Sequence, residues 1–224
     1  MLESFQLSSS NAALLVVDVQ NDFCHNQGVF SKYKTVTLDH VEQAISNLSA
    51  LIEKCRAFNL PIIFIKTIHS DWTNSPSWLK RMGGAGEKMR ICPPDSWGSN
   101  FFNVVPKEGD CIVTKHRYSA FIGTDLDLIL KSQGTEYILV TGVATNVCVE
   151  STARDGYHRD YNVVLIEDCC GAYDKAEHAA TLNNISKFFG TVTTSETLIA
   201  TLEKLEGKRL NQKSGDGNLG SPLF

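Results

Sequence analysis

Short apolar runs alternate with amphipathic segments along almost the whole of this chain of 224 residues. Six of the runs are rich in β-branched residues, as buried strands are: residues 13–17, 62–66, 111–115, 137–141, 162–166 and 191–193. Apolar residues recur at helical spacing between them, over residues 38–58, 124–132, 145 onward, 175–189 and 196–205. Continuous apolar strands that alternate with helices predict an α/β fold. We expect three α/β/α layers with a central, mostly parallel, six-stranded sheet.

This alternation contains no internal repeat and no interdomain linker, so we expect a single domain over residues 1–206. Residues 70–102 break the pattern, because they hold the three tryptophans, three prolines and a glycine-rich stretch. A long irregular excursion in a compact domain is typically a lid or a binding loop. The tail, residues 207–224, is polar and rich in glycine. We expect it to be disordered alone, or to pack on a neighbouring subunit.

The composition narrows the classes of partner. A formal net charge of −4 argues against a nucleic-acid binder, which needs a basic surface for phosphates. The longest apolar runs, residues 12–17 and 60–65, are too short to span a membrane. Seven cysteines without disulfide-framework spacing indicate reduced thiols, and no secretory signal is visible at the start of the chain. We therefore expect a cytoplasmic protein whose partner is a small molecule.

Cys148 is the strongest candidate for a catalytic residue. The strand at residues 137–141 runs into a turn of small residues, where Thr145 is a plausible helix N-cap. Cys148 then falls in the first helical turn, where the helix dipole favours a thiolate and free backbone N–H groups can stabilise an oxyanion. The alternative is that Cys148 is a buried structural cysteine, a common role for this residue type.

Two charged residues also follow predicted strands, and parallel strands place their carboxyl ends at the same edge of a sheet. Asp18 follows the first strand and Lys115 ends the third, so both can meet Cys148. Together they supply a nucleophile, a base and a cation. Taken singly, Asp18 could cap a turn and Lys115 could be an exposed strand end. Asp22 is a rival for the base, although a solvated or capping role in its turn is favoured.

Three segments resemble the signature motifs of the isochorismatase-like cysteine hydrolases: Val17-Asp-Val-Gln-Asn-Asp-Phe23, Lys115-His-Arg-Tyr-Ser-Ala-Phe121 and Gly142-Val-Ala-Thr-Asn-Val-Cys-Val149. The resemblance covers about residues 10–205 and implies a Rossmann-like fold and a homo-oligomer, dimer or tetramer. It also implies that Asp18, Lys115 and Cys148 form the catalytic triad. The Val143–Ala144 bond matches the family's non-proline cis peptide, and the backbone N–H groups of Ala144 and Cys148 match its oxyanion hole.

Within the family, residues 117–119, 146–152 and 154–156 resemble the ureidoacrylate amidohydrolase branch. This resemblance implies hydrolysis of a C–N bond in a small amide or ureido compound. Nicotinamidases carry a metal-binding Asp-x-His after the second strand, but this chain has Thr67-Ile-His69 there, so we expect no metal and no cofactor. His69 is then either a substrate contact or a packed histidine. The presence of Cys148 favours C–N hydrolysis over the vinyl-ether hydrolysis of isochorismate.

Phe23, Trp97 and Tyr118 are candidates for an aromatic wall around a small planar substrate. Arg117 either pairs with a substrate carboxylate or with a neighbouring acid. The sequence thus predicts a metal-independent cysteine amidohydrolase that works through an acyl-enzyme. The alternatives are an isochorismate-type vinyl-ether hydrolase and a catalytically silent scaffold on the same fold.

Overall fold

The computed structural model of the chain describes residues 7–34, 36–82 and 90–216. Six parallel strands form one central sheet in the order β3-β2-β1-β4-β5-β6. Their bounds are β1 (Ala12–Val17), β2 (Ile62–Thr67), β3 (Cys111–Lys115), β4 (Tyr137–Val143), β5 (Asn162–Gly171) and β6 (Thr191–Thr193). The predicted six-stranded α/β sheet is confirmed, and every strand pair in it is parallel.

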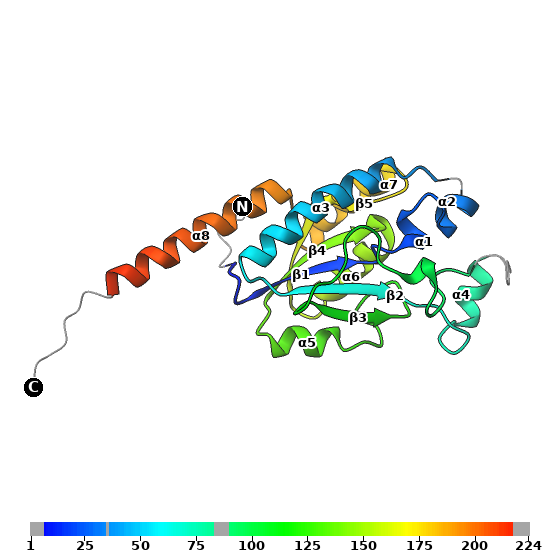
Figure 1. Cartoon of the computed structure of the whole chain (residues 1–224), viewed down its shortest axis with the longest axis horizontal. Coiled ribbons are helices and arrows are strands. Elements are labelled where there is room, and N and C mark those ends of the chain that lie inside the picture. Colours follow the sequence, from blue (N-terminus) through cyan, green and yellow to red (C-terminus); the bar gives the residue numbers. More distant parts are fainter. Residues whose placement is uncertain (1–6, 35, 83–89, 217–224) are drawn as a thin grey trace, which may run out of the picture.

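Helices cover both faces of this sheet (Figure 1). On one face, α3 (Asp39–Ala57) and α8 (Ser195–Asp216) share a core with alternate residues of β1, Leu14 among them. On the other face, α5 (Leu126–Ser132), α6 (Glu150–Tyr157) and α7 (Lys175–Phe188) pack against the intervening residues of β1, such as Leu15. The residues of β1 are fully buried, which is why its sequence is apolar without alternation.

Short elements gather beyond the carboxyl ends of the strands (Figure 1). They are α1 (Asn21–Cys24), α2 (Val29–Lys34), α4 (Pro76–Arg81) and the 3₁₀ turn η3 (Trp97–Ser99). The excursion over residues 70–102 therefore contains two helical elements, although residues 83–89 lie outside the described part. It returns to the sheet through an antiparallel bridge between Gln20 and Phe101.

The last helix is longer than predicted. Helix α8 continues to Asp216, whereas the sequence predicted its end at residue 205. Beyond residue 205 the chain has no proline before Pro222, and several residues that favour helix follow: Glu206, Lys208, Arg209, Leu210, Gln212 and Lys213. Gly207 lies inside the helix with nothing within 4 Å of where its Cβ would be. Figure 1 shows this end of α8 leading away from the body of the molecule.

Across the described ranges, no helix combines the length and the apolar character needed to cross a membrane.

Candidate active site

Three side chains from three strands meet at the carboxyl edge of the sheet. Asp18 directly follows β1, Lys115 is the last residue of β3, and Cys148 lies in η4 (Thr145–Val149), the turn after β4. The Lys115 Nζ lies 2.7 Å from Asp18 Oδ2 and 3.5 Å from Cys148 Sγ. The structure thus brings together the three residues that the strand ends indicated. All three are buried.

The Lys115 ammonium is surrounded by acceptors. Besides Asp18 and Cys148, it donates to Thr67 Oγ1 at 2.7 Å and to the Arg117 carbonyl at 2.9 Å. Burial by itself lowers the pKa of Lys115, but the charge of Asp18 and the hydrogen bond to Cys148 outweigh burial and raise it. Lys115 is therefore a permanent cation. Its hydrogen bonds go to Thr67 Oγ1, the Arg117 carbonyl and Cys148 Sγ, of which the sulfur is the most distant. Asp18 Oδ2 is an ion-pair partner at 2.7 Å that accepts no hydrogen bond from the described residues.

Asp18 has an unusual backbone conformation, with φ of 52°. Aspartate tolerates this left-handed region better than most residues. Its N–H still donates to Ile65 O at 2.9 Å, so the strand ladder extends to this point before the chain turns. The carboxylate is held at both oxygens, because Thr67 Oγ1 donates to Oδ1 at 3.0 Å while Lys115 pairs with Oδ2.

Cys148 lies in the first turn after β4, as predicted, but this turn is π-helical and its cap differs. The N-cap is Ala144, whose carbonyl accepts the N–H of Val149, five residues on, at 3.3 Å. The predicted N-cap, Thr145, is wrong. Its buried hydroxyl lies 3.0 Å from Nδ1 of His178 in α7. The hydroxyl therefore makes a tertiary contact and does not cap the turn.

The protonation state of Cys148 also differs from the sequence expectation of a thiolate. Burial raises the pKa of the Cys148 thiol and outweighs the opposing effect of Lys115, and Asp18 raises the pKa further. Lys115 donates to the sulfur at 3.5 Å, but Thr67 Oγ1 and the Arg117 carbonyl accept from it at 2.7 and 2.9 Å, so its charge is shared among several partners. The resting residue is a thiol, so a base must take its proton.

The backbone before η4 comes very close to β1. Gly142 has φ of 111°, and a Cβ there would lie 2.1 Å from the Val17 carbonyl oxygen. Only glycine fits this position. The following Val143–Ala144 peptide bond is cis. The turn that carries Cys148 is therefore held directly against the strand that carries Asp18.

Asp22, the rival for the base, has another task. Its Oδ2 accepts the N–H of Cys92 at 2.7 Å and its Oδ1 that of Val29 at 3.4 Å. A Cβ on Gly98 would lie 2.2 Å from Asp22 Oδ2. The side chain is buried, so a solvated role is wrong, whereas a capping role agrees with its bond to the N–H of Val29, the first residue of α2. Asp22 also organises the loops around η3. Asp22 forms no ion pair with Lys115 in the part of the chain that the structure describes.

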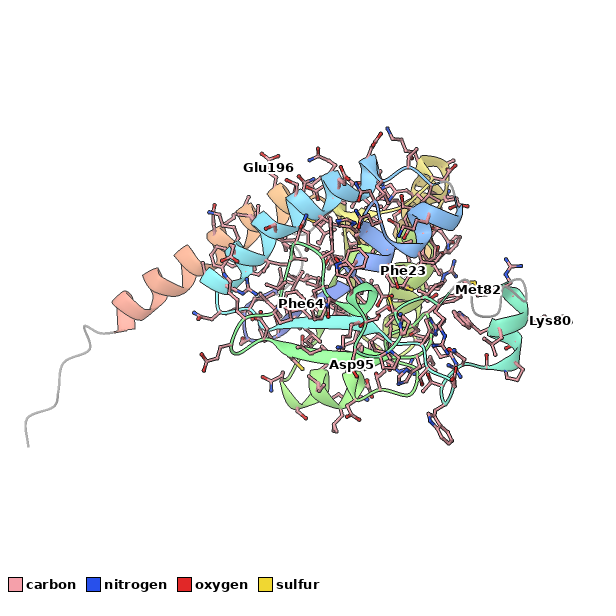
Figure 2. All side chains as sticks on the ribbon, turned by 45° about the vertical axis from the view of Figure 1, so that its right-hand side comes forward. Phe23, Phe64, Lys80, Met82, Asp95 and Glu196 are labelled. Atoms are coloured by element: carbon pink, nitrogen blue, oxygen red, sulfur yellow. The ribbon has the colours of Figure 1, made fainter. Side chains whose placement is uncertain are left out.

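The predicted substrate-contacting aromatics do not form one continuous wall. Phe23 packs on Phe30 with ring centroids 5.3 Å apart, and Trp97 meets His25 edge-on at 5.0 Å. Tyr118 is 45% exposed. Over the ranges with described coordinates, no ring contact joins Phe23, Trp97 and Tyr118 to one another. Figure 2 shows Phe23 toward the centre of the molecule, while Lys80 and Met82 lie near its outer end.

His69 is packed. Its ring stacks on Trp78 with centroids 4.0 Å apart, and its Nδ1 lies 3.1 Å from Asn74 Oδ1. Burial lowers the pKa of His69 to about 4, so the imidazole is neutral at pH 7. No group of three or more His, Cys, Asp or Glu residues suited to a metal ion occurs in the described residues.

Arg117 does not pair with an acid in the described part of the chain. Its Nη1 donates to the carbonyls of Thr73, at 2.9 Å, and His116, at 2.6 Å. Among the described residues, the alternative of a neighbouring acid is therefore not met, and pairing with a substrate carboxylate stays a prediction. The guanidinium links β3 to the loop after β2 and is exposed at the site's rim.

Sequence reasoning did not identify two polar residues at this edge. Thr67 ends β2 and contacts both Asp18 and Lys115. Gln20 bonds the Thr67 backbone through both amide atoms, with Oε1 accepting the N–H at 2.7 Å and Nε2 donating to the carbonyl at 3.0 Å. The strand-end rule that selected Asp18 and Lys115 would also have selected Thr67, because β2 lies between β1 and β3.

The chain resembles known proteins over most of its length. The family model for the isochorismatase domain matches residues 12–197. The ureidoacrylate amidohydrolase RutB of Yersinia enterocolitica is 34% identical over 210 residues, which cover 87% of this chain and 90% of that protein. RutB of Serratia proteamaculans is 32% identical over 214 residues, 89% of this chain and 86% of that protein.

Solved structures give the same result. A cysteine hydrolase from Pseudomonas syringae pv. phaseolicola superposes with a TM-score of 0.80 at 26% identity, over 90% of this chain and 96% of that one. N-carbamoylsarcosine amidase from Thermoplasma acidophilum has a TM-score of 0.67 at 26% identity, over 83% of this chain and 96% of that one. The chain belongs to the isochorismatase family of hydrolases.

Proposed function

We propose that this protein is a cysteine amidohydrolase that cleaves a C–N bond of a small ureido or amide compound. The observation that carries the proposal is the buried cluster in which Lys115 contacts both Asp18 and Cys148. Burying two opposite charges is costly, and their pairing beside a thiol at a strand edge is explained by chemistry at that thiol. The names of the related ureidoacrylate amidohydrolases support the reaction class.

In the first step, the Cys148 thiol gives its proton to Asp18 as the sulfur attacks the substrate carbonyl carbon. The C=O double bond becomes a single bond, and the oxyanion is held by the backbone N–H groups of Ala144 and Cys148. The Lys115 ammonium offsets the negative charge that develops around the sulfur. Since the resting thiol is protonated, proton transfer to Asp18 accompanies the attack.

In the second step, the intermediate collapses and the C–N bond breaks. Asp18 returns the proton to the departing nitrogen, which leaves as ammonia or an amine, and Cys148 keeps the acyl group as a thioester. Water then gives a proton to Asp18 and attacks the thioester. The product acid leaves, and the proton on Asp18 returns to the sulfur, which restores the starting thiol.

For the substrate, we propose a small planar ureido acid. The related RutB proteins are ureidoacrylate amidohydrolases, and a solved relative is an N-carbamoylsarcosine amidase. Phe23, Trp97, Tyr118 and His69 are the candidate contacts around the bound acyl group, with His69 neutral at pH 7. We propose that the reaction needs no metal, because His69, the imidazole next to the end of β2, is already stacked on Trp78 and bonded to Asn74.

The test is ammonia release from a panel of ureido acids, carbamoyl amino acids and primary amides, with Cys148→Ala beside the wild type. We expect release from one compound class, loss of that release in Cys148→Ala and Cys148→Ser, and no effect of a chelator. Both variants should keep the wild-type circular dichroism spectrum. Release that survives in folded Cys148→Ala contradicts the proposal. A folded wild type that is silent on the whole panel also contradicts it, and pyruvate release from isochorismate would then indicate vinyl-ether hydrolysis.

A further inference from the structure

We infer that Thr67 is a positioning residue of this site, whose hydroxyl fixes the carboxylate oxygen of Asp18 that receives the Cys148 proton. The inference rests on the proposed function for its role in turnover. The hydroxyl lies between the two charged residues, 2.7 Å from Lys115 Nζ and 3.0 Å from Asp18 Oδ1. Thr67 is 3% exposed, so water does not compete for these contacts.

The direction of both hydrogen bonds follows from chemistry. A lysine ammonium donates and cannot accept, so Thr67 Oγ1 is the acceptor from Lys115. The single proton of the hydroxyl is then left for Asp18 Oδ1. The hydrogen bonds from Lys115 to Thr67 and from Thr67 to Asp18 therefore have fixed directions as long as Lys115 is charged.

This arrangement divides the work between the two oxygens of Asp18. Oδ1 accepts from Thr67, whereas Oδ2 faces Lys115. When the S–H bond of Cys148 breaks, the new O–H bond forms at Oδ2, where no hydroxyl donor lies in the way. The proton later leaves from the same oxygen to the departing nitrogen, so the acid and base steps use a single geometry.

Thr67 also limits what Lys115 can give to the sulfur. The ammonium has three N–H groups for four neighbours: Asp18 Oδ2, Thr67 Oγ1, the Arg117 carbonyl and Cys148 Sγ. Removing the hydroxyl leaves three neighbours for three N–H groups, so fewer oxygens compete with the sulfur for the ammonium. The loss of the donor to Oδ1 also makes Asp18 a stronger base. The first change lowers the pKa of the thiol, whereas the second makes Asp18 a poorer acid toward the leaving nitrogen.

The hydroxyl is not what holds β2 in place. The Thr67 backbone N–H and carbonyl are both bonded by the Gln20 side chain, at 2.7 and 3.0 Å, and neither bond involves Oγ1. Replacing Thr67 by valine keeps the shape of the side chain and this backbone clamp. A merely structural role therefore predicts little change in the chemistry of Cys148.

The experiment is the pH dependence of Cys148 alkylation by iodoacetamide, read at the Cys148 peptide by mass spectrometry, which needs no substrate. The charged groups that face the thiol are Lys115 from β3 and Asp18 from β1. In Thr67→Val we expect the alkylation midpoint to fall by about one pH unit, the size of one charge-assisted hydrogen bond. We expect kcat on the best substrate to fall roughly tenfold or more with KM little changed, because the proton steps and not binding are affected.

Two further variants make the test specific. Thr67→Ser keeps the hydroxyl, so we expect it to restore the alkylation midpoint and most of kcat. Thr141→Val is the matched control, because Thr141 is also a buried strand threonine but donates to the Leu15 carbonyl, at 2.8 Å. We expect Thr141→Val to alkylate with the wild-type pH profile.

A wild-type alkylation profile in folded Thr67→Val overturns the inference, as does an equal shift in Thr141→Val. If Thr67→Val fails to fold, Thr67→Ala is judged by the same two criteria. A shifted profile in a protein that turns over no compound supports the Thr67 arrangement and contradicts only the proposed function. A wild-type alkylation profile together with Cys148-dependent turnover supports the proposed function and contradicts the Thr67 arrangement.

Discussion

At the scale of single residues, the site is the ion pair of Asp18 and Lys115 beside the Cys148 thiol. Asp18 and Lys115 are each buried and lie 2.7 Å apart, so neither charge is compensated if the other is removed. Breaking such a pair typically costs about 3–5 kcal/mol of folding free energy. The same two residues thus determine both stability and the chemistry of Cys148. Asp22, only four positions from Asp18, provides a comparison that separates these roles.

We expect Asp18→Asn to lower kcat by roughly a thousandfold, because the amide can neither accept nor return the proton. It should also lower the free energy of unfolding by about 3 kcal/mol, since Lys115 is left unpaired. Asp22→Asn keeps an oxygen for the Cys92 N–H, so its kcat should stay within about tenfold of the wild type. Urea unfolding and steady-state kinetics measure both. Full activity in Asp18→Asn with none in Asp22→Asn would assign the base to Asp22.

At the scale of elements, the active site depends on how β4 leads into η4. Gly142, with φ of 111°, allows β4 to run against β1 up to the point where the chain turns toward Cys148. The Thr145 hydroxyl contacts His178 of α7, so this helix also supports the turn. The position of Cys148 is therefore set by contacts with a neighbouring strand and a distant helix, and only in part by its own helix.

We expect Gly142→Ala to lower the free energy of unfolding by at least about 2 kcal/mol, because the new Cβ meets the Val17 carbonyl and φ is unfavourable. Gly207→Ala is the matched control. It lies in α8 with open space around it, and should raise stability by up to about 1 kcal/mol. Urea unfolding of both variants tests the difference. Equal stability of the two variants would mean that the close approach to β1 has no cost.

The sequence predicted the elements well and their tertiary contacts poorly. Asp18, Lys115 and Cys148 could be found because each follows an apolar run, and parallel topology brings such ends together. Thr67 was missed because the strand-end rule was applied only to charged residues, and an uncharged threonine needs no buried partner to explain it. The partner of Thr145 is 33 residues away, so local capping rules could not reveal it. The raised pKa of Cys148 depends on burial and on the other partners of Lys115, which only the folded chain specifies.

Across the described part of the molecule, many of the buried titratable side chains are cysteine thiols. Six cysteines are buried, and burial raises the pKa of each of them, in the case of Cys55 to about 12. In the unfolded chain a cysteine titrates near pH 8.5. A thiol whose folded pKa is raised contributes stability that is fully present below the unfolded pKa and is lost as the pH rises toward the folded value.

We therefore expect the free energy of unfolding to fall steeply between pH 8 and pH 10. Each buried thiol contributes about 1–2 kcal/mol to this fall at pH 10, so the sum approaches the whole stability of a typical domain. Cys55→Ala should be less stable at pH 7, because it leaves a cavity in the α3 core, yet its stability should fall less steeply with pH. Urea unfolding across this pH range measures the slope. An unchanged slope in Cys55→Ala would mean that this thiol already ionises in the folded state.

The residue pairing between the parallel strands affects how well a chain with misaligned strands is tolerated. Lys115 lies opposite Thr67, and Val17, the residue before Asp18, lies opposite Gly142. A slip of one residue in β3 would turn Lys115 toward the exposed face of this edge strand, where Ile112 and Thr114 lie, and would leave the Asp18 carboxylate buried without its cation. A one-residue slip of β4 would put a residue with a side chain where Gly142 now lies, against the backbone of Val17. Misaligned chains are thus penalised at the residues used for catalysis, and the reactivity of Cys148 is a direct assay of correct strand alignment.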